Sequence, residues 1–446
     1  MSLPRYPEYK DSGIPLLGSI PAHWSAARLK EVIRSIESGV SVNATDVPAA
    51  EDAIGVLKTS CVYDGTFRCK ENKAVVEEDL SRVSCPVAEG TLIVSRMNTP
   101  PLVGAAGLVT QSHPNIYLPD RLWQVSLRNS SPNFVHYWTL SGEYRAQVEV
   151  ACSGTSSSMQ NLGQDQFRNF QIALPLEDEQ HAIATFLDRE TAKIDALIAE
   201  QEKLLALLAE KRQATISHAV TRGLNPNASM RDSGIPWLGE VPAHWLIGGL
   251  TKFIGPVVDY RGRTPAKGDA GTFLVTAKNV RNGAIDYAAS EEYVDPVEAN
   301  ALLSRGRPEV GDVLFTTEAP LGQVAQIDRT DIALAQRIVK FRGLEGVLIN
   351  RFLMYWLMGS ACQSQLETLA TGSTALGIKA SKLGMIECLV PPIPEQQKIV
   401  GHIDRQLSQF IDLEVEAVRG IDLLRERRSA LISAAVTGKI DVRGAV

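Results

Sequence analysis

The sequence predicts an internally duplicated chain, in which two α/β domains are separated by two long helices that pair as an antiparallel coiled coil. Three observations predict this fold. One sequence unit occurs twice, each copy contains a mixed segment of domain size, and each copy ends in a long amphipathic stretch. A chain of 446 residues is also too long for one compact core, which agrees with two or three domains.

The duplication is clearest where each copy begins. The segment DSGIPLLGSIPAHW, residues 11–24, returns as DSGIPWLGEVPAHW, residues 232–245, at an offset of 221 residues. Farther along, Glu179-Gln180 matches Glu395-Gln396 at an offset of 216, so small insertions and deletions separate the copies. A period this long makes each copy a domain with its connector, and not a solenoid repeat.

The domain boundaries follow from the repeat. Residues 1–173 are expected to hold an opening segment and the first mixed domain, and residues 174–224 a long helix. Residues 225–389 then hold the second opening segment and domain, and residues 390–446 a second long helix and a tail. Pairing of the two helices would relate the matching halves by a pseudo-twofold axis.

The mixed segments carry strand signals. Short apolar, β-branched runs such as TLIVS (91–95) and DVLFTT (312–317) are bounded by turn residues, which is typical of strands. A helical stretch around Tyr137-Trp138 or Tyr355-Trp356 closes each segment. We therefore expect two α/β domains with irregular sheets.

Both connectors have the pattern of long helices. Their apolar residues recur mostly at steps of three, four or seven, which is the spacing of a coiled-coil seam, and Glu, Lys, Arg and Gln flank them. Gly223 and Gly438 are the expected stops. The seam consists of Ile183, Leu187, Ile194, Leu205 and Leu208 in the first helix, and of Ile399, Ile403, Phe410, Ile421, Leu424 and Leu431 in the second.

Two arrangements can cover this seam. Each helix could pack on its own domain, or the two helices could pair with each other. About 40 residues make a rod of roughly 60 Å. Because one small domain hardly covers an apolar seam of that length, the sequence favours pairing, most simply antiparallel.

Composition narrows the function classes. With 44% hydrophobic and 22% charged residues the chain resembles an ordinary soluble protein. The start lacks the pattern of a signal peptide and no apolar run is long enough for a membrane span, so we expect a cytoplasmic protein. The six cysteines are scattered without metal-ligand spacing, which favours buried thiols over a metal site or disulfides.

The search for catalytic chemistry finds no motif. There is no phosphate-binding or dinucleotide-binding glycine loop, and the seven histidines lack metal-ligand spacing. His23 and His244 recur at matching places, which favours a hydrogen-bonded turn histidine beside a packed tryptophan. The Ser/Thr/Gly loops at 154–163 and 372–384 are typical of helix caps or phosphate donors. We expect no catalytic residue, no metal and no cofactor bound by this chain.

Local basic segments are the candidates for nucleic-acid contact. Arg and Asn can read guanine and adenine edges, although each such residue, taken singly, is more typical of a surface salt-bridge partner. The net charge of −6 is unusual for a DNA reader and implies local basic stripes or phosphate contacts supplied by partners. The candidates are Lys58, Arg68, Arg96 and Asn98 in the first domain, and Arg261, Arg263, Lys278, Asn279 and Arg281 in the second.

The order of these parts resembles the specificity subunits of type I restriction-modification systems. The resemblance rests on DSGIPxLGxxPAHW before each mixed domain, the EQ-containing start of each long helix, and the closing ALISAAVTGKIDVR, residues 430–443. It implies that the mixed segments are target recognition domains, one for each half of a bipartite double-stranded DNA site, with the paired helices as a ruler. It also places GDVLFTTEAPLG, residues 311–322, near the DNA.

Further implications of the resemblance concern partners. The helices would dock two modification subunits, which carry S-adenosylmethionine and methylate adenine, and the complex would recruit ATP-dependent restriction subunits. S-adenosylmethionine, ATP and Mg²⁺ are thus expected on the partners, and no membrane is involved. Two alternatives stay open: a non-DNA scaffold that recruits partner proteins through a coiled-coil spacer, and an unrecognised nuclease or transferase.

Overall fold

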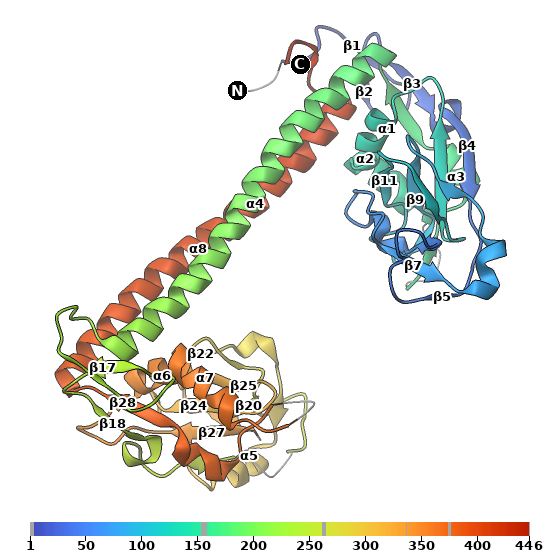
Figure 1. Ribbon diagram of the computed structural model, residues 1–446. Coiled ribbons are helices and arrows are strands. Elements are labelled where there is room, and N and C mark those ends of the chain that lie inside the picture. Colours follow the sequence, from blue (N-terminus) through green and yellow to red (C-terminus); the bar gives the residue numbers. More distant parts are fainter. Residues whose placement is uncertain (1–3, 153–157, 261–264, 336, 373–375, 446) are drawn as a thin grey trace. The chain divides into compact units, whose positions relative to one another are not determined.

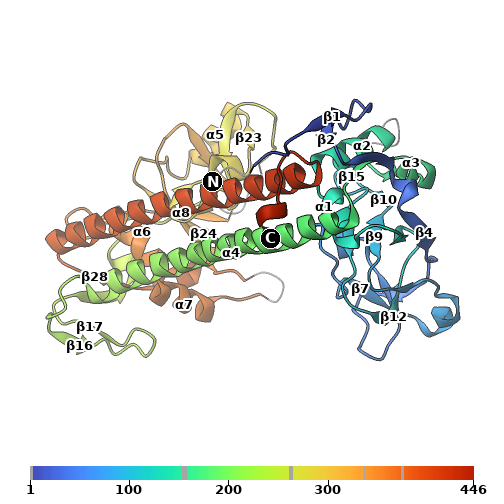
Figure 2. The same ribbon diagram turned by 90° about the horizontal axis from the view of Figure 1, so that it is seen from above.

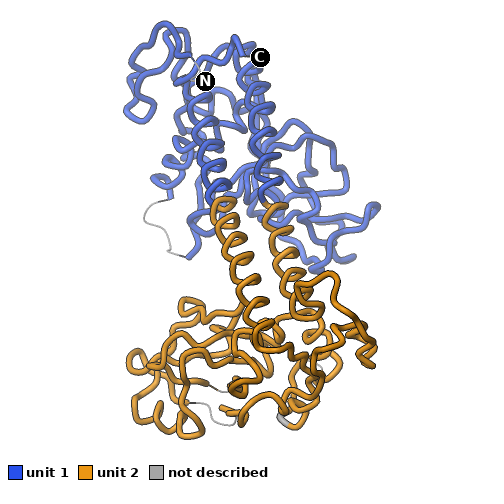
Figure 3. The backbone as a smooth tube through the Cα atoms, turned by 90° about the vertical axis from the view of Figure 1, so that its left-hand side faces the viewer, with its two compact units in different colours: residues 1–201, 419–446 blue, residues 202–418 orange. Residues whose placement is uncertain are grey.

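The computed structural model describes residues 4–152, 158–260, 265–335, 337–372 and 376–445 (Figure 1). The chain forms two compact units. Unit 1 contains residues 1–201 and 419–446, and unit 2 contains residues 202–418 (Figure 3). Each unit combines one mixed domain with about half of each long helix.

The first domain is built on two mainly antiparallel sheets. The four-stranded sheet has the order β11-β9-β13-β4, and the five-stranded sheet has the order β5-β7-β6-β12-β8, in which β12 and β6 are parallel. The strands are β4 Ile33–Ser38, β5 Ala44–Thr45, β6 Gly55–Leu57, β7 Asn72–Val75, β8 Pro86–Val87, β9 Leu92–Ser95, β11 Ala106–Leu108, β12 His113–Tyr117 and β13 Leu122–Leu127.

Small strand pairs and short helices complete the first domain. The helical stretch predicted around Tyr137-Trp138 is helix α1, which precedes α2 and α3. The helices are α1 Pro132–Thr139, α2 Gly142–Cys152 and α3 Gln164–Arg168. The strand pairs are β1 Tyr9–Asp11 with β2 Ser19–Pro21, β3 Ser25–Arg28 with β15 Gln171–Leu174, and β10 Met97–Asn98 with β14 Gln160–Asn161.

The second domain repeats the central sheet with different surroundings. Its four-stranded sheet has the order β19-β27-β24-β25, and a three-stranded sheet has the order β23-β20-β26 with β20 and β26 parallel. These strands are β19 Val258–Asp259, β20 Thr272–Val275, β23 Tyr293–Val294, β24 Val313–Thr317, β25 Leu321–Gln326, β26 Ile332–Leu334 and β27 Ile338–Phe341.

Several other elements of the second domain have counterparts in the first. Pairs β16-β17 and β18-β28 match β1-β2 and β3-β15, so the duplication seen in the sequence extends to the fold. The helices are α5 Pro296–Leu303, α6 Asn350–Met358 and α7 Ser360–Leu369. The strand pairs are β16 Met230–Asp232 with β17 Glu240–Pro242, β18 Leu246–Gly249 with β28 Glu387–Val390, and β21 Val280–Arg281 with β22 Ala284–Ile285.

Two long helices, α4 Glu177–Arg222 and α8 Ile393–Val436, run side by side (Figure 1, Figure 2). In unit 1 the first half of α4 shares a core with the last turns of α8, where Ile183 and Leu187 lie with Ile432. In unit 2 the second half of α4 shares a core with the first half of α8. The first half of one helix therefore meets the last half of the other, and the predicted antiparallel pairing is confirmed.

The predicted seam is largely buried between the helices and the domains. The core that holds Ile183 also contains Phe134 and Trp138 of the first domain, so the helix packs on its domain as well as on its partner helix. Three seam residues are only partly buried: Leu205, Leu424 and Leu431. The buried seam residues are Ile183, Leu187, Ile194, Leu208, Ile399, Ile403, Phe410 and Ile421.

Both long helices end where the glycines indicate. Gly223 directly follows α4 and Gly438 follows α8, and both have φ of +72°, the left-handed conformation of a helix stop. Among the described helices, none combines the length and the apolar character that a membrane span requires. The six cysteines, all within the described residues, form no disulfide, and four of them are buried: Cys61, Cys152, Cys362 and Cys388.

Candidate nucleic-acid interface

A histidine and a tryptophan join each opening segment to the start of a long helix. His23 Nε2 lies 2.8 Å from Glu179 Oε2, and His244 Nε2 lies 2.7 Å from Glu395 Oε2. The tryptophan that follows each histidine is at most 1% exposed. The prediction of a hydrogen-bonded turn histidine beside a packed tryptophan is confirmed for both copies.

The glutamine after each of these glutamates ties the helix to its domain. Gln180 Oε1 accepts hydrogen bonds from Ser130 Oγ at 2.7 Å and from the backbone nitrogen of Ser131 at 2.9 Å. Gln396 Oε1 accepts one from the backbone nitrogen of Ile349 at 2.8 Å. Ser131 and Ile349 directly precede α1 and α6, so the glutamine fixes the domain to the helix in both units. The repeat marked the Glu-Gln pair in the sequence but did not indicate this role.

Two predicted DNA contacts of the first domain, Lys58 and Arg68, lie at the 3₁₀ turn Thr59–Val62, which follows β6. Lys58 precedes this turn, and its Nζ lies 3.5 Å from Asp46 Oδ1. The backbone nitrogen of Arg68 donates to the Cys61 carbonyl, and the Arg68 side chain pairs with Asp64. The backbones of Lys58 and Arg68 therefore meet at the same turn, although ten residues separate them in the sequence.

Asn98 takes a structural role beside this turn. Its side chain is 7% exposed, and its amide nitrogen donates to Tyr63 Oη at 3.2 Å and to Ser95 Oγ at 3.1 Å. Its Oδ1 accepts from the backbone nitrogen of Thr99. An amide that is buried and bonded in this way has no free edge for adenine. The expectation that Asn98 reads a base is corrected, whereas Arg96, partly buried after β9, remains a predicted contact.

The same correction applies to Asn279 in the second domain. This residue is 0% exposed, and its amide nitrogen donates to the carbonyl oxygens of Asp286 and Ser290 at 2.9 Å each. Its Oδ1 accepts two hydrogen bonds from Thr276, both of 2.9 Å. Asn279 therefore closes its own turn and does not face a ligand.

The predicted lysine and arginine near Asn279 do reach the surface. Lys278 and Arg281 are exposed, and a terminal nitrogen of Arg281 donates to the Lys278 carbonyl at 3.2 Å. Both remain predicted DNA contacts. Arg261 and Arg263, the other two predicted contacts of this domain, lie outside the described residues.

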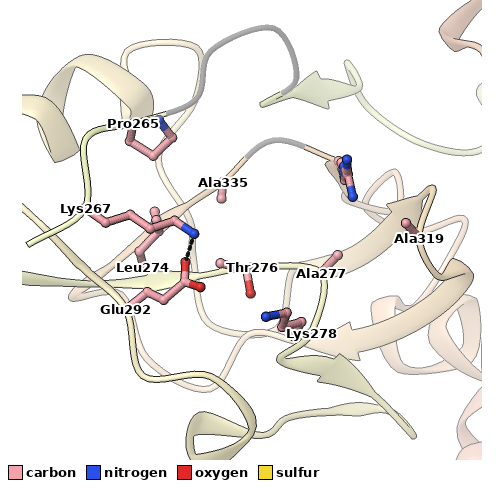
Figure 4. Close-up of a pocket in the computed structure, with 10 residues that line it drawn as sticks. Pro265, Lys267, Leu274, Thr276, Ala277, Lys278, Glu292, Ala319 and Ala335 are labelled. Atoms are coloured by element: carbon pink, nitrogen blue, oxygen red, sulfur yellow. Dashed lines mark ion pairs between the residues drawn. The ribbon is translucent and has the colours of Figure 1, made fainter.

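A cationic cavity of about 220 Å³ adjoins Lys278 (Figure 4). Lys267 Nζ and Glu292 Oε2 form an ion pair of 2.7 Å at its wall. Burial alone would raise the pKa of Glu292, but hydrogen bonds from Lys267 and Ser290 outweigh it and lower that pKa. The lining also contains Arg337, which the sequence did not single out. Three cations and one ionised carboxylate line the cavity, so it attracts anions.

Exposed apolar side chains follow one face of α8 in unit 2. Ile411, Val415 and Val418 are 46%, 59% and 48% exposed, and their spacing of four and three residues places them on one side of the helix. Leu204 and Leu207 of α4 are exposed in the same unit. Large apolar side chains in such a row are typical of a surface that binds another protein.

Comparison with known proteins identifies a family. A model described as the type I restriction modification DNA specificity domain matches residues 51–206 and 276–418, one stretch in each copy. The putative type I restriction enzyme MjaX specificity subunit of Methanocaldococcus jannaschii is 20% identical over 441 residues, which cover 96% of both chains. The type I restriction enzyme EcoEI specificity subunit of Escherichia coli is 28% identical over 159 residues, 35% of this chain and 27% of that relative.

Solved structures share the fold. A chain from a structure described as the basis of complex assembly and conformational transition of the type I R-M system aligns with a TM-score of 0.61 at 17% identity, over 96% of this chain and 99% of that one. The HsdS subunit from Thermoanaerobacter tengcongensis aligns with a TM-score of 0.50 at 16% identity, over 94% and 98%. Because the family model matches more than half of the residues, with a stretch in each copy, the chain belongs to the type I restriction-modification DNA specificity family.

Proposed function

We propose that this chain is the non-catalytic DNA-reading subunit of a type I restriction-modification complex, and that each mixed domain reads one half of a bipartite target. The duplication carries this proposal, because the specificity-domain model matches each copy separately. In both copies a glutamine of the long helix accepts a hydrogen bond from the backbone nitrogen that precedes α1 or α6, while the polar side chains on the domain surface differ between the copies. Two domains with different surface side chains on the same scaffold suit a target whose two half-sites differ in sequence.

The paired helices would space the readers and dock the other subunits. The exposed row of Ile411, Val415 and Val418 supports docking, since leaving such a row in water is unfavourable. The partners are two modification subunits that hold S-adenosylmethionine and methylate adenine, and restriction subunits that use ATP and Mg²⁺. This chain binds no cofactor itself. Its net charge of −6 favours a division of the phosphate contacts between it and the modification subunits.

Mapping of N6-methyladenine tests the proposal directly. The chain and its modification subunit are expressed in a host without adenine methylation, and the methylated sites are sequenced. We expect two short sequence blocks around a fixed unread gap, and no methylation when the chain is omitted. A single continuous block, or methylation without this chain, would contradict the proposal.

A salt titration separates DNA reading from the scaffold alternative. Binding of the complex to a duplex that carries the mapped target should weaken steeply as salt rises, because phosphate contacts release counterions. A scaffold without a DNA function would show no specific binding at any salt concentration. The purified chain alone should also show no nuclease or methyltransferase turnover with S-adenosylmethionine and Mg²⁺, and robust turnover would refute the non-catalytic assignment.

Inserting one heptad into each long helix tests the ruler. The insertions are placed after Gln201 in α4 and after Val418 in α8, so that the apolar seam continues in both helices. Seven helical residues add about 10 Å of rod, which corresponds to roughly three base pairs. We expect a longer unread gap with both half-site sequences unchanged. Altered half-site bases around an unchanged gap would refute the ruler.

A further inference from the structure

An arginine occupies the same turn in both domains. Arg121 precedes β13, and Arg337 precedes β27, the matching strand of the second domain. The backbone nitrogen of Arg96 donates to the carbonyl of Arg121 at 3.0 Å, and that of Thr317 donates to the carbonyl of Arg337 at 2.8 Å. The two turns are therefore equivalent, although neither arginine belongs to a repeated motif in the sequence.

The second of these turns holds a strained backbone. Arg337 has φ of +73°, in the left-handed region that few residues other than glycine and Asn adopt. Thr317 contacts this turn twice, since its Oγ1 as well as its backbone nitrogen donates to the Arg337 carbonyl, at 3.1 Å and 2.8 Å. Ala319, another wall residue of the cationic cavity, has φ of +44°. Backbone strain that the surrounding fold maintains is concentrated at functional sites of proteins.

The Glu318 carboxylate pairs with the Nε edge of the Arg337 guanidinium. Arg337 Nε lies 3.0 Å from Glu318 Oε1, and the two side chains are 46% and 48% exposed. Gly377 pairs with Glu318 in an antiparallel bridge, which fixes the backbone that carries the carboxylate. Because a guanidinium has five donors in a planar fork, a carboxylate at Nε leaves donors on the terminal nitrogens for a second planar partner.

A second cation, Lys278, lines the same cavity as Arg337. Lys278 is exposed and forms no ion pair within the described ranges, whereas Lys267 is paired with Glu292. An arginine fork beside such a lysine matches two common contacts of DNA-binding proteins. The fork can bind O6 and N7 of guanine, and the lysine can bind a phosphate.

We propose that Arg337 and Arg121 are base-reading residues at matching positions of the second and first domains, and that Arg337 contacts a guanine. This inference rests on the proposed function. Glu318 is a positioning residue for Arg337. In the first domain Met97 stands at the place of Glu318, so Arg121 is exposed without that carboxylate beside it. The arginine of this turn therefore has a carboxylate beside it in the second domain and a methionine in the first domain.

Methylation mapping of matched variants of the whole complex tests the assignment. In Arg337→Ala the backbone contacts of the turn persist, and we expect discrimination at one guanine of the second half-site to fall about tenfold to a hundredfold. Arg121→Ala should relax one position of the first half-site only. Arg329→Ala is the control, because Arg329 has the same side-chain exposure of 46% and pairs with Asp331 outside the cavity. It should leave the motif unchanged.

Two further measurements make the test decisive. Arg337→Lys should behave like Arg337→Ala, since a lysine cannot form the two parallel hydrogen bonds. Glu318→Gln should weaken discrimination at the same position as Arg337→Ala and at no other. Unchanged recognition of the first half-site in every second-domain variant shows that the protein is folded and the complex assembled.

Several outcomes would overturn the inference and leave the proposed function intact. One is that complexes with Arg337→Ala and with Arg121→Ala methylate the same bipartite motif as the wild-type complex. Another is a uniform loss of binding across sequences with a salt slope reduced by about 1, which would identify Arg337 as a phosphate contact. The absence of any bipartite motif in the wild-type complex would instead refute the proposed function.

Discussion

The central sheets of the two domains bury a polar pair at the same place but build it from different side chains. In the first domain Thr91 and Gln124 meet in the interior, where Thr91 Oγ1 lies 3.4 Å from Gln124 Oε1. In the second domain Lys340 Nζ donates to Asp312 Oδ2 at 2.8 Å. The sheet register establishes the match, because Gln124 and Lys340 lie opposite the second residue of β9 and of β24, respectively.

This difference shows that the two domains share a backbone hydrogen bond at this place but differ in the side chains that surround it. The residue before β9 or β24 accepts the same backbone hydrogen bond in both copies, from Val109 to Thr91 and from Ile327 to Asp312. The side chain of that residue is neutral in one copy and ionic in the other. A buried ion pair adds little net stability over a neutral replacement, but it strongly penalises the loss of one partner. The two domains should therefore respond differently to matched substitutions.

Asp312→Asn should destabilise the protein most. Asp312 is 1% exposed and also accepts a hydrogen bond from Arg342 Nε at 2.6 Å, so removing its charge leaves Lys340 buried without a counter-ion. We expect a loss of about 3–5 kcal/mol in the second domain. The matched Thr91→Val should cost about 1 kcal/mol in the first domain. Hydrogen exchange of β24 and β9 amides, read by mass spectrometry, measures each domain separately, and equal losses would contradict the comparison.

The stability of the second domain near Lys340 is expected to depend on pH in acid. Burial alone would raise the pKa of Asp312, but hydrogen bonds from Arg342 and Lys340 outweigh it and lower that pKa. A carboxyl whose folded pKa is depressed stabilises the fold fully above its unfolded pKa of about 4, and this contribution is lost as the pH falls through the folded value. The stability difference between the wild type and Asp312→Asn should therefore shrink below about pH 4. A constant difference far into the acid range would exclude this role of Asp312.

The ends of the long helices offer a second matched pair, with a smaller effect. A Cβ on Gly438 would overlap Pro21 Cδ, whereas a Cβ on Gly223 would lie 3.1 Å from Trp245 Cζ2. Both positions have positive φ, so alanine is strained at each. We expect Gly438→Ala to cost about 3 kcal/mol and Gly223→Ala about 1–2 kcal/mol in urea unfolding. A larger loss for Gly223→Ala would show that the two junctions are not packed as described.

The smallest expected effect concerns the ion pair between the long helices in unit 1. Arg428 Nε lies 2.9 Å from Asp195 Oδ1, and the side chains are 32% and 53% exposed. Asp195→Asn should change the free energy of unfolding by less than about 1 kcal/mol, because solvent screens this pair. Raising the salt concentration should reduce the effect further. A loss comparable to that of Asp312→Asn would mean that the pair is far better shielded from solvent than its exposure indicates.

The duplication, the long helices and their ends can all be predicted from the sequence alone. These features are periodic or local: the seam recurs mostly every three, four or seven residues, and Gly223 and Gly438 mark the stops within one turn of their helices. The role of the histidine in each opening segment can also be predicted, because its repetition beside a tryptophan indicates an architectural role. Patterns of this kind depend on residues that are close in the sequence, so they can be interpreted without knowledge of distant contacts.

Which polar side chains are available to a ligand depends on the tertiary structure and cannot be predicted from the sequence. Asn98 and Asn279 have the residue type of a base reader, yet their side-chain amides are buried and hydrogen-bonded inside the domains. Arg121 and Arg337 carry no signal in the sequence and occupy matching turns. The reason is that the partners of a side chain depend on strand pairing over long separations. The register of β13 on β9, and of β27 on β24, is what places the two arginines at equivalent positions.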